Sequence, residues 1–321
     1  MWPLSVCKRA VMELLSFTLH PIPPFRLDLT AWALRRRAHN QVDRWDGTTW
    51  RRVLVIGQEA LEAAVDQSGT AEHPRLSVTL SGARIPPHAK DAAAKLLRQI
   101  LGLSVDLSPF YRLAADDKQL APLADRFRGL KPPRFPTVFE GLVNGIACQQ
   151  LSLTVGIWLL NRLAARCGPG VHLQKAKQHG FPRPLDILRV RESTLCGMGF
   201  SHSKARYLLA ASRAAAGGGL DAGQLAGLDD AAIVEKLLYL RGIGRWTAEY
   251  VLLRGFGRIN VFPGDDVGAR NRLARWLGRD QPMDYEGVRR ATRWWQPYSG
   301  LVYFHLLLDG LVQSGAIAEP E

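Results

Sequence analysis

Cysteine is scarce in this sequence of 321 residues, and its four cysteines lie far apart. They form no C-x-x-C pair and have no nearby histidine at the spacing of a zinc motif; they are Cys7, Cys148, Cys167 and Cys196. Scattered thiols of this kind are typical of proteins kept in a reduced compartment. We therefore expect buried free thiols, a cytoplasmic protein and no disulfide framework.

Long apolar runs are missing as well. No segment reaches the roughly 20 apolar residues that a helix needs to cross a bilayer. In the opening segment, MWPLSVCKRAVMELLSF, the basic residues Lys8 and Arg9 lie inside the apolar stretch and not ahead of it, unlike the order in a secretory signal peptide. We expect no membrane partner, and we interpret residues 1–16 as a frayed or amphipathic N-terminal extension.

The sequence also lacks a Walker A loop, a G-x-S-x-G elbow and internal repeats, so several common enzyme classes and the repeat folds lose support. An apolar content of 47% and a charged content of 22% are those of a folded globular protein. Lys and Arg number 42 against 29 Asp and Glu, a formal net charge of +13. Such an excess favours a polyanionic partner, most commonly nucleic acid.

Periodicity divides the chain into two parts. Residues 17–104 carry strand-like runs with one helix-like run between the first two, which predicts a small α+β domain; the strand-like runs are 17–20, 48–57 and 75–82, and the helix-like run is 30–37. Three arginines end that helix, Arg35, Arg36 and Arg37, and we interpret them as a solvated helix face in preference to a DNA contact.

From Pro86 onward the pattern is helical to the end, and we assign residues 105–321 to a separate helical region. The predicted fold class is therefore α+β, with a small N-terminal antiparallel sheet domain and a large all-helical region in two lobes. Within the helical region, Gln149 and Gln150 interrupt an otherwise apolar helix pair. Because a buried amide is costly unless it is hydrogen-bonded, these glutamines either cap a helix junction or face a ligand.

A Gly-x-Gly turn lies in the helical segment 230–255. Gly242-Ile243-Gly244 separates two apolar-periodic runs and is flanked by Arg241 and Arg245, a pattern that predicts helix, tight turn and helix. Glycines allow positive φ angles there, and the orphan N–H groups that open the second helix attract an anion such as phosphate. An ordinary helical hairpin would contain the same turn, so the turn alone leaves both interpretations open.

One helix further on, the segment 262–266 ends in Pro-Gly-Asp-Asp and opens another helix, which carries several arginines. A carboxylate at a helix start is usually an N-cap, and that role is compatible with a chemical one. On the intervening helix, Trp246 and Tyr250 lie four residues apart and so share a face. Two aromatic rings near a carboxylate suit a flat base rotated out of a duplex, although periodicity alone favours two core residues.

Together these motifs resemble the helix-hairpin-helix DNA glycosylases with the Gly/Pro-Asp signature (HhH-GPD), and specifically the alkylpurine branch, the 3-methyladenine DNA glycosylase II type. The resemblance covers most of the chain and rests on four segments: FTLHPIPPFRLDLTAWALRRR, FEGLVNGIACQQLS, LRGIGRWTAEY and VFPGDD. It implies a monofunctional enzyme of base excision repair that flips out alkylated purines and hydrolyses their N-glycosidic bonds. The implied partner is double-stranded DNA with damaged bases, and we expect a monomer associated with the nucleoid.

The resemblance also implies roles for individual residues. Asp266, the last Asp of the signature, would be the catalytic carboxylate, and Asp265 would support it in the base pocket. Trp246 and Tyr250 would line that pocket, and a further pocket aromatic of related enzymes falls on Leu307, with Tyr303 and Phe304 one turn earlier. The DNA wedge would be Gln150 or Leu151, and the hairpin from Arg241 to Arg245 would hold a phosphate.

The chemistry implied for Asp266 is electrostatic. A negative carboxylate beside C1′ would stabilise an oxocarbenium-like transition state and could orient the attacking water. An alkylated purine is already cationic and leaves as a neutral base, so that no strong general acid is needed.

The same resemblance indicates what the protein does without. Lyase members of the superfamily carry a lysine two residues after the second hairpin glycine, where this chain has Trp246, so we expect no Schiff-base intermediate. No cysteine follows Cys196, which argues against an iron–sulfur cluster. We expect no cofactor and no certain metal ligand, although hairpin carbonyls can hold a monovalent cation in this family.

Two other functions stay open at the level of sequence. A non-catalytic helix-hairpin-helix protein could bind lesions without cutting, but it would have no need of Asp266. An oxidised-purine glycosylase/lyase would require lysine where Trp246 stands.

Overall fold

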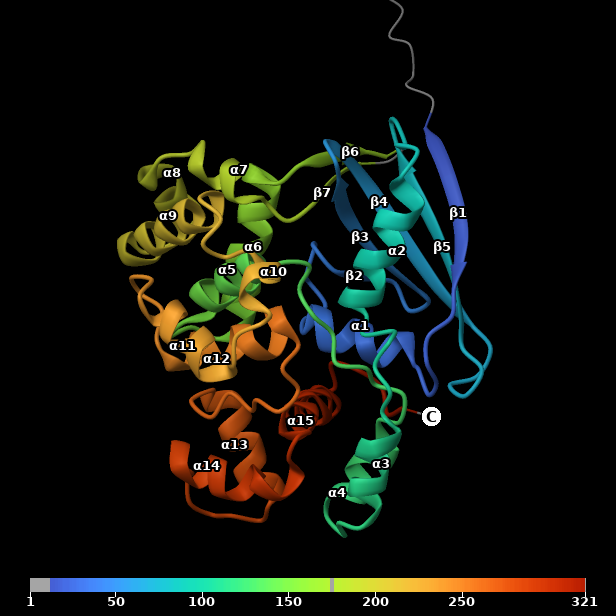
Figure 1. Cartoon of the computed structure of the whole chain (residues 1–321), viewed down its shortest axis with the longest axis vertical. Coiled ribbons are helices and arrows are strands. Elements are labelled where there is room, and N and C mark those ends of the chain that lie inside the picture. The colour runs from blue at the N-terminus through green and yellow to red at the C-terminus, as the bar shows by residue number, and fades with distance from the viewer. Residues whose placement is uncertain (1–11, 174–175, 321) are drawn as a thin grey trace, which may run out of the picture.

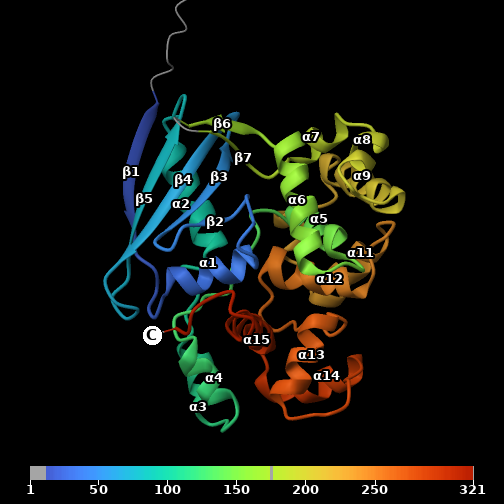
Figure 2. The same cartoon turned by 180° about the vertical axis from the view of Figure 1, so that it is seen from behind.

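The computed structural model describes residues 12–173 and 176–320. Cys7 and most of the predicted N-terminal extension therefore lie outside the described residues. A twisted sheet forms one side of the molecule, and the helical region packs beside it and below it (Figures 1 and 2). The predicted α+β class is confirmed.

The sheet has five antiparallel strands in the order β1-β5-β4-β3-β2. The strands are β1 (Glu13–Leu19), β2 (Arg44–Trp45), β3 (Thr49–Ile56), β4 (Glu59–Ser68) and β5 (Arg75–Gly82). β3 and β5 match the predicted runs, whereas β1 begins four residues before the predicted start at Phe17. The start of β1 moves the end of the N-terminal extension back to residue 12.

Two helices complete the N-terminal domain, α1 (Leu27–Arg35) and α2 (Ala89–Ile100). The face of α2 that carries Ala89, Ala93, Leu97 and Ile100 is buried, which is the i, i+4, i+8 spacing of a helix packed on one side. Its side chains join those of the sheet in one apolar cluster around Trp50. Figure 1 shows α2 lying across the sheet.

The helical region contains helices of very different length. They are α3 (Ser108–Ala115), α4 (Leu120–Arg126), α5 (Val138–Cys148), α6 (Leu153–Cys167), α7 (Pro184–Leu188), α8 (Glu192–Gly197), α9 (His202–Ala216), α10 (Ala222–Leu225), α11 (Asp230–Leu238), α12 (Arg245–Val251), α13 (Val267–Trp276), α14 (Tyr285–Thr292) and α15 (Ser299–Gln313). A π-helical turn, Leu252–Phe256, extends α12.

The prediction of an all-helical region needs one correction. A two-stranded hairpin, β6 (Gly170–His172) and β7 (Lys177–His179), follows α6. α6 ends at Cys167 because the next residue, Gly168, has an extended backbone. The chain then runs out towards β4 of the sheet, which β6 contacts.

Two apolar clusters hold the helical region together and correspond to the two predicted lobes. One gathers buried residues of α3, α4, α13, α14 and α15, and the other gathers those of α5 to α9, α11 and α12. In Figure 1 the first lies at the bottom, in teal, orange and red, and the second lies beside the sheet, in green to orange.

A buried ion triad joins the sheet to the second lobe. Arg52 of β3 donates hydrogen bonds to Asp43 at 2.8 Å and to Glu140 of α5 at 2.6 Å, and all three side chains are at most 5% exposed. A buried cation of this kind requires its anions, because water cannot replace them. Among the described residues, no helix combines the length and the apolarity that crossing a bilayer requires.

Candidate active site

A cleft opens where the turn between α5 and α6 faces α12 and the start of α13. Its outer part is a groove of about 820 Å³ that also reaches α9 and the hairpin turn. Its inner part is a cavity of about 360 Å³ that reaches α15. The groove and the cavity share Trp246, Asp266 and the turn residues Leu151 and Ser152 in their walls, so they form one continuous cleft.

Asp266 lies at the junction between the groove and the cavity. It is the N-cap of α13, since its Oδ1 accepts the N–H of Ala269 at 2.9 Å. Its Oδ2 accepts the hydroxyl of Tyr303 at 3.2 Å. Burial and the nearby charge of Asp266 raise the pKa of Tyr303 well above its usual value, so this phenol keeps its proton and donates. The two donors fix the orientation of the carboxylate.

Asp265 lies differently from its neighbour. Its carboxylate pairs with the Arg245 guanidinium at 2.7 Å, and this guanidinium stacks over the ring of Tyr285, 3.6 Å from its centroid. Asp265 lines the groove but is not among the residues that line the inner cavity. The prediction that it belongs to the base pocket is therefore corrected to a position at the rim, because Arg245 draws its side chain away from the cavity.

Glu249 holds the loop that carries Asp266, and sequence reasoning missed it. This buried carboxylate of α12 accepts the Tyr285 hydroxyl at 2.6 Å and the N–H of Gly264 at 3.1 Å. Burial raises its pKa, although both hydrogen bonds oppose the shift. An acidic residue on the apolar face of the hairpin helix was the available signal, since such a residue needs a partner.

Aromatic rings form the wall of the inner cavity. Trp246 and Tyr250 are stacked, with ring centroids 5.7 Å apart and planes inclined by 28°. Tyr303 and Leu307 of α15 complete this wall, and Tyr303 supplies an aromatic ring one turn before Leu307. Tyr250 is part of the core of the sheet domain, as periodicity predicts, whereas Trp246 is half-buried. That the pair receives a flipped base stays a prediction.

Among the described residues that line the cavity, Trp246 and Arg36 each have a buried side-chain nitrogen without a hydrogen-bond partner. In the described part of the chain, the indole Nε1 of Trp246 is buried and has no hydrogen-bond partner. A buried donor without a partner costs free energy, which a ligand can recover by accepting from it.

The arginines at the end of α1 are not a solvated helix face, and that prediction is wrong. Arg35 and Arg36 are only 5% and 4% exposed. Arg36 ends the helix with a left-handed backbone, φ 61°, which turns its side chain into the molecule. There it donates to the Tyr250 hydroxyl at 2.7 Å and to Asn144 Oδ1 at 2.6 Å. Arg36 therefore lines the inner cavity, as Arg37 also does.

The two glutamines between α5 and α6 have different positions. Gln149 donates from its amide to the carbonyl of Gly242 at 2.8 Å and to Thr247 Oγ1 at 3.0 Å, so it ties the turn to the hairpin. Gln150 has a left-handed backbone, φ 53°, and an exposed side chain. Leu151 is 43% exposed and lines both parts of the cleft. Of the two predicted wedge residues, Leu151 is the one that faces the cavity.

The predicted hairpin is present, with α11 and α12 on either side of the turn. Gly242 has φ +85°, and a Cβ atom there would lie 2.3 Å from the ring of Tyr207, so only glycine fits. Gly244 is the N-cap of α12 and offers no side chain to cap it, which leaves the first N–H groups of the helix without intrahelical partners. Ile243 packs into the second lobe, and Arg241 is exposed.

The thiols and the predicted hairpin cation can also be located. Cys148, Cys167 and Cys196 are free thiols. They are half-buried, whereas we expected them to be fully buried. Burial nevertheless raises the pKa of Cys148 and of Cys167. At the hairpin, the carbonyl of Gly242 already accepts a hydrogen bond from Gln149, and a monovalent cation there stays a prediction.

Comparisons with known proteins place this geometry in context. Residues 143–297 match the sequence profile of a family described as "HhH-GPD superfamily base excision DNA repair protein". A "DNA-3-methyladenine glycosylase" of Bacillus subtilis is 29% identical over 222 residues, which are 68% of this chain and 73% of that protein. "DNA-3-methyladenine glycosylase 2" of Escherichia coli is 26% identical over 293 residues, 90% of this chain and 96% of that protein.

Among solved structures, a "3-methyladenine dna-glycosylase from Archaeoglobus fulgidus" superposes with a TM-score of 0.81 at 25% identity and covers 94% of this chain and 100% of that one. The likeness therefore extends over the sheet as well as the helices.

Proposed function

Because this chain belongs to the HhH-GPD superfamily of base excision DNA repair proteins, we propose that it is a monofunctional DNA glycosylase that removes alkylated purines. Its substrate is double-stranded DNA with a damaged base of the 3-methyladenine type, its product is an abasic site, and it acts as a monomer. The observation that carries the proposal is the position of Asp266, at the mouth of an aromatic-walled cavity.

In this proposal the damaged base leaves the duplex and enters the inner cavity. The stacked rings of Trp246 and Tyr250 accept its flat face, and a cationic base gains further from the electron-rich ring faces. The unsatisfied Trp246 Nε1 can donate to an acceptor atom of the base. The sugar remains at the mouth, beside Asp266.

Asp266 then supplies the chemistry. Its negative charge stabilises the positive charge that develops at C1′ as the bond to the base breaks, and it can orient the attacking water. The donors Tyr303 and Ala269 hold the carboxylate in place before the reaction, so that little reorganisation is needed. An alkylated purine leaves as a neutral base and requires no strong acid.

The groove binds the DNA backbone. The unpaired N–H groups at the start of α12, beside Gly244, donate hydrogen bonds to a phosphate, and the net charge of +13 favours the polyanion. Leu151 fills the gap that the flipped nucleotide leaves, because an apolar wedge loses less hydration there than an amide.

Base release from methylated duplex DNA tests the role of Asp266. We expect Asp266→Asn to abolish release of 3-methyladenine while binding of DNA persists. Asparagine caps helices as well as aspartate does, so the start of α13 should survive the change. The matched control is Asp265→Asn, which also removes one charge but lies at the rim, and it should keep measurable activity. Full activity of Asp266→Asn would refute the proposed mechanism.

The same assay separates the two other functions. A lesion-binding protein without catalysis would release no base from any substrate. A glycosylase/lyase would form a covalent adduct with DNA that borohydride traps, and we expect none because Trp246 occupies the place of the lyase lysine.

A further inference from the structure

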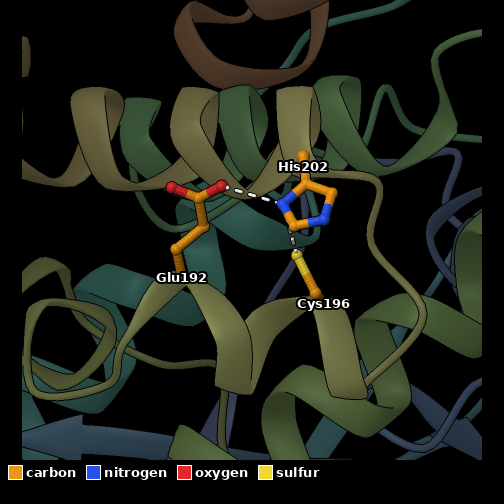
Figure 3. Close-up of side chains that lie close together, drawn as sticks. All are labelled: Glu192, Cys196 and His202. Atoms are coloured by element: carbon orange, nitrogen blue, oxygen red, sulfur yellow. Dashed lines mark hydrogen bonds and ion pairs between the residues drawn. The ribbon is translucent and has the colours of Figure 1, made fainter.

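A second cluster of reactive side chains lies at the corner between α8 and α9. Glu192 and Cys196 are four residues apart on α8, and His202 is the first residue of α9. Figure 3 shows the three side chains pointing toward one another. His202 Nδ1 lies 3.1 Å from Glu192 Oε1 and 3.6 Å from Cys196 Sγ. None of these residues lines the cleft described above.

The geometry distinguishes a chelate from a catalytic triad. In a Cys-His-carboxylate triad the thiol and the carboxylate address opposite nitrogens of the imidazole ring, because one nitrogen accepts a proton while the other donates one. Here both partners lie beside the same nitrogen, Nδ1, as the two dashed lines in Figure 3 show. One ring nitrogen has a single proton or a single lone pair, so it cannot serve both partners fully.

A metal ion at the centre of the three atoms removes that conflict. Ligand bonds of about 2.3 Å for Zn–S, about 2.05 Å for Zn–N and about 2.1 Å for Zn–O, at tetrahedral angles, put sulfur about 3.6 Å and oxygen about 3.4 Å from the nitrogen. The observed separations are 3.6 and 3.1 Å, and all three ligand atoms lie within 4.8 Å of one another. A thiolate, an imidazole and a carboxylate form a donor set typical of zinc.

We propose that Glu192, Cys196 and His202 bind one Zn²⁺ ion, with water as the fourth ligand. The side chain of His202 is 80% exposed, which leaves the fourth position open to solvent. Five residues separate Cys196 from His202 because the chain turns the corner between two helices there. This spacing does not match the usual sequence motifs for zinc.

The ion would fasten α8 to the first turn of α9, and this turn reaches the cleft. Ser201 and Ser203 line the groove on either side of His202. Lys204 donates to the carbonyls of Ala147 at 3.0 Å and of Gln149 at 2.7 Å, and so it holds the turn that carries Leu151. Zinc at the corner would therefore stiffen the support of that turn from a place outside the cleft.

Zinc titration of the full chain, in competition with a chromophoric chelator, tests the site. We expect one equivalent to bind to the wild type and at least tenfold weaker binding in Cys196→Ser and in His202→Gln. The matched control is Cys167→Ser, which removes another half-buried thiol outside the cluster and should bind zinc like the wild type. Cobalt as a spectroscopic substitute should show a thiolate charge-transfer band in the wild type and in Cys167→Ser, but not in Cys196→Ser.

Two results would overturn the proposal. One is equal affinity for zinc in the wild type and in both cluster variants, and the other is an equal loss in the Cys167→Ser control. His202→Gln keeps the test independent of folding, because its side chain is largely exposed and its unfolding midpoint without metal should equal that of the wild type.

Discussion

At the scale of single residues, the hydroxyl of Tyr303 is the side-chain group that orients Asp266 by a hydrogen bond. Tyr303→Phe removes the donor to Oδ2 and leaves the ring that lines the cavity. A hydrogen bond to a charged group contributes about 1.5 to 3 kcal/mol. We therefore expect base release in single turnovers to slow by about 10- to 100-fold with little change in DNA binding. An unchanged rate would mean that the capping N–H of Ala269 alone orients the carboxylate.

His305 is a second residue whose effect can be measured, in this case as a pH dependence of the free energy of unfolding. It is fully buried, its Nδ1 lies 2.8 Å from the carbonyl of Leu301, and its ring packs against Phe110 and Phe127. Burial lowers the pKa of His305 from 6.5 to about 4. Between these two pKa values the unfolded chain binds more protons at His305 than the folded chain does. The contribution of neutral His305 to the stability of the folded state is therefore complete above pH 6.5 and is lost as the pH falls towards 4.

Replacing His305 tests this linkage. We expect His305→Leu to reduce the pH dependence of the free energy of unfolding between pH 6.5 and 4, by at most about 1.4 kcal/mol per pH unit. Urea denaturation at pH 7 and at pH 5 measures it. His20→Gln, a change at an exposed histidine, should retain the wild-type slope. A wild-type slope in His305→Leu would place the acid sensitivity elsewhere.

Single residues also show the reach of sequence reasoning. Asp266, Trp246 and Tyr250 were predicted to lie together because one helix and a short loop connect them, and helical spacing fixes which side chains share a face. Arg36 was missed because its partners, Asn144 and Tyr250, are remote in the chain, so that no local pattern predicts its burial. Glu249 lies on an apolar helix face, which indicates that it needs a partner, but its partners Gly264 and Tyr285 cannot be identified from the sequence alone.

At the scale of elements, the turn between α5 and α6 depends on a neighbouring helix. Lys204→Met removes both hydrogen bonds from α9 to the carbonyls of this turn. Since the turn carries Leu151, we expect weaker binding of duplex DNA, by about tenfold, and a slower release of base. Lys90→Met controls for the lost charge, because Lys90 is an exposed residue of α2. Equal effects of both changes would reduce the role of Lys204 to its charge.

Elements differ in how well the sequence predicts them. β4 (Glu59–Ser68) was not predicted, since its Glu and Ala residues favour helix, yet its pairing with β3 and β5 makes it a central strand. Within the helical pattern, the sequence does not indicate the break that separates the two short helices α7 and α8. The helical pattern from Pro86 onward begins with α2, whose apolar face repeats over three turns and is therefore readily recognised in the sequence.

At the scale of the whole molecule, the ion triad of Arg52 determines how firmly the sheet is attached to the helices. Arg52→Met leaves the carboxylates of Asp43 and Glu140 buried without their cation. We expect a loss of about 3 to 5 kcal/mol in the free energy of unfolding. Arg51 lies beside Arg52 on β3, and Arg51→Met breaks only a surface pair with Asp46. This change should lower the free energy of unfolding by at most about 1 kcal/mol. Denaturant unfolding of both variants checks the difference, and equal effects would contradict it.

The walls of the inner cavity come from parts of the molecule that fold around separate cores. Tyr250 belongs to the core of the sheet domain, Tyr303 and Leu307 belong to one helical lobe, and α12 is anchored by Ala248 and Val251 in the other. An enzyme that cuts bases from DNA is a hazard when it is misassembled. In this architecture, a chain in which one of the three cores has not packed against the others has no complete pocket. The activity that removes bases therefore requires that all three cores are correctly folded and assembled.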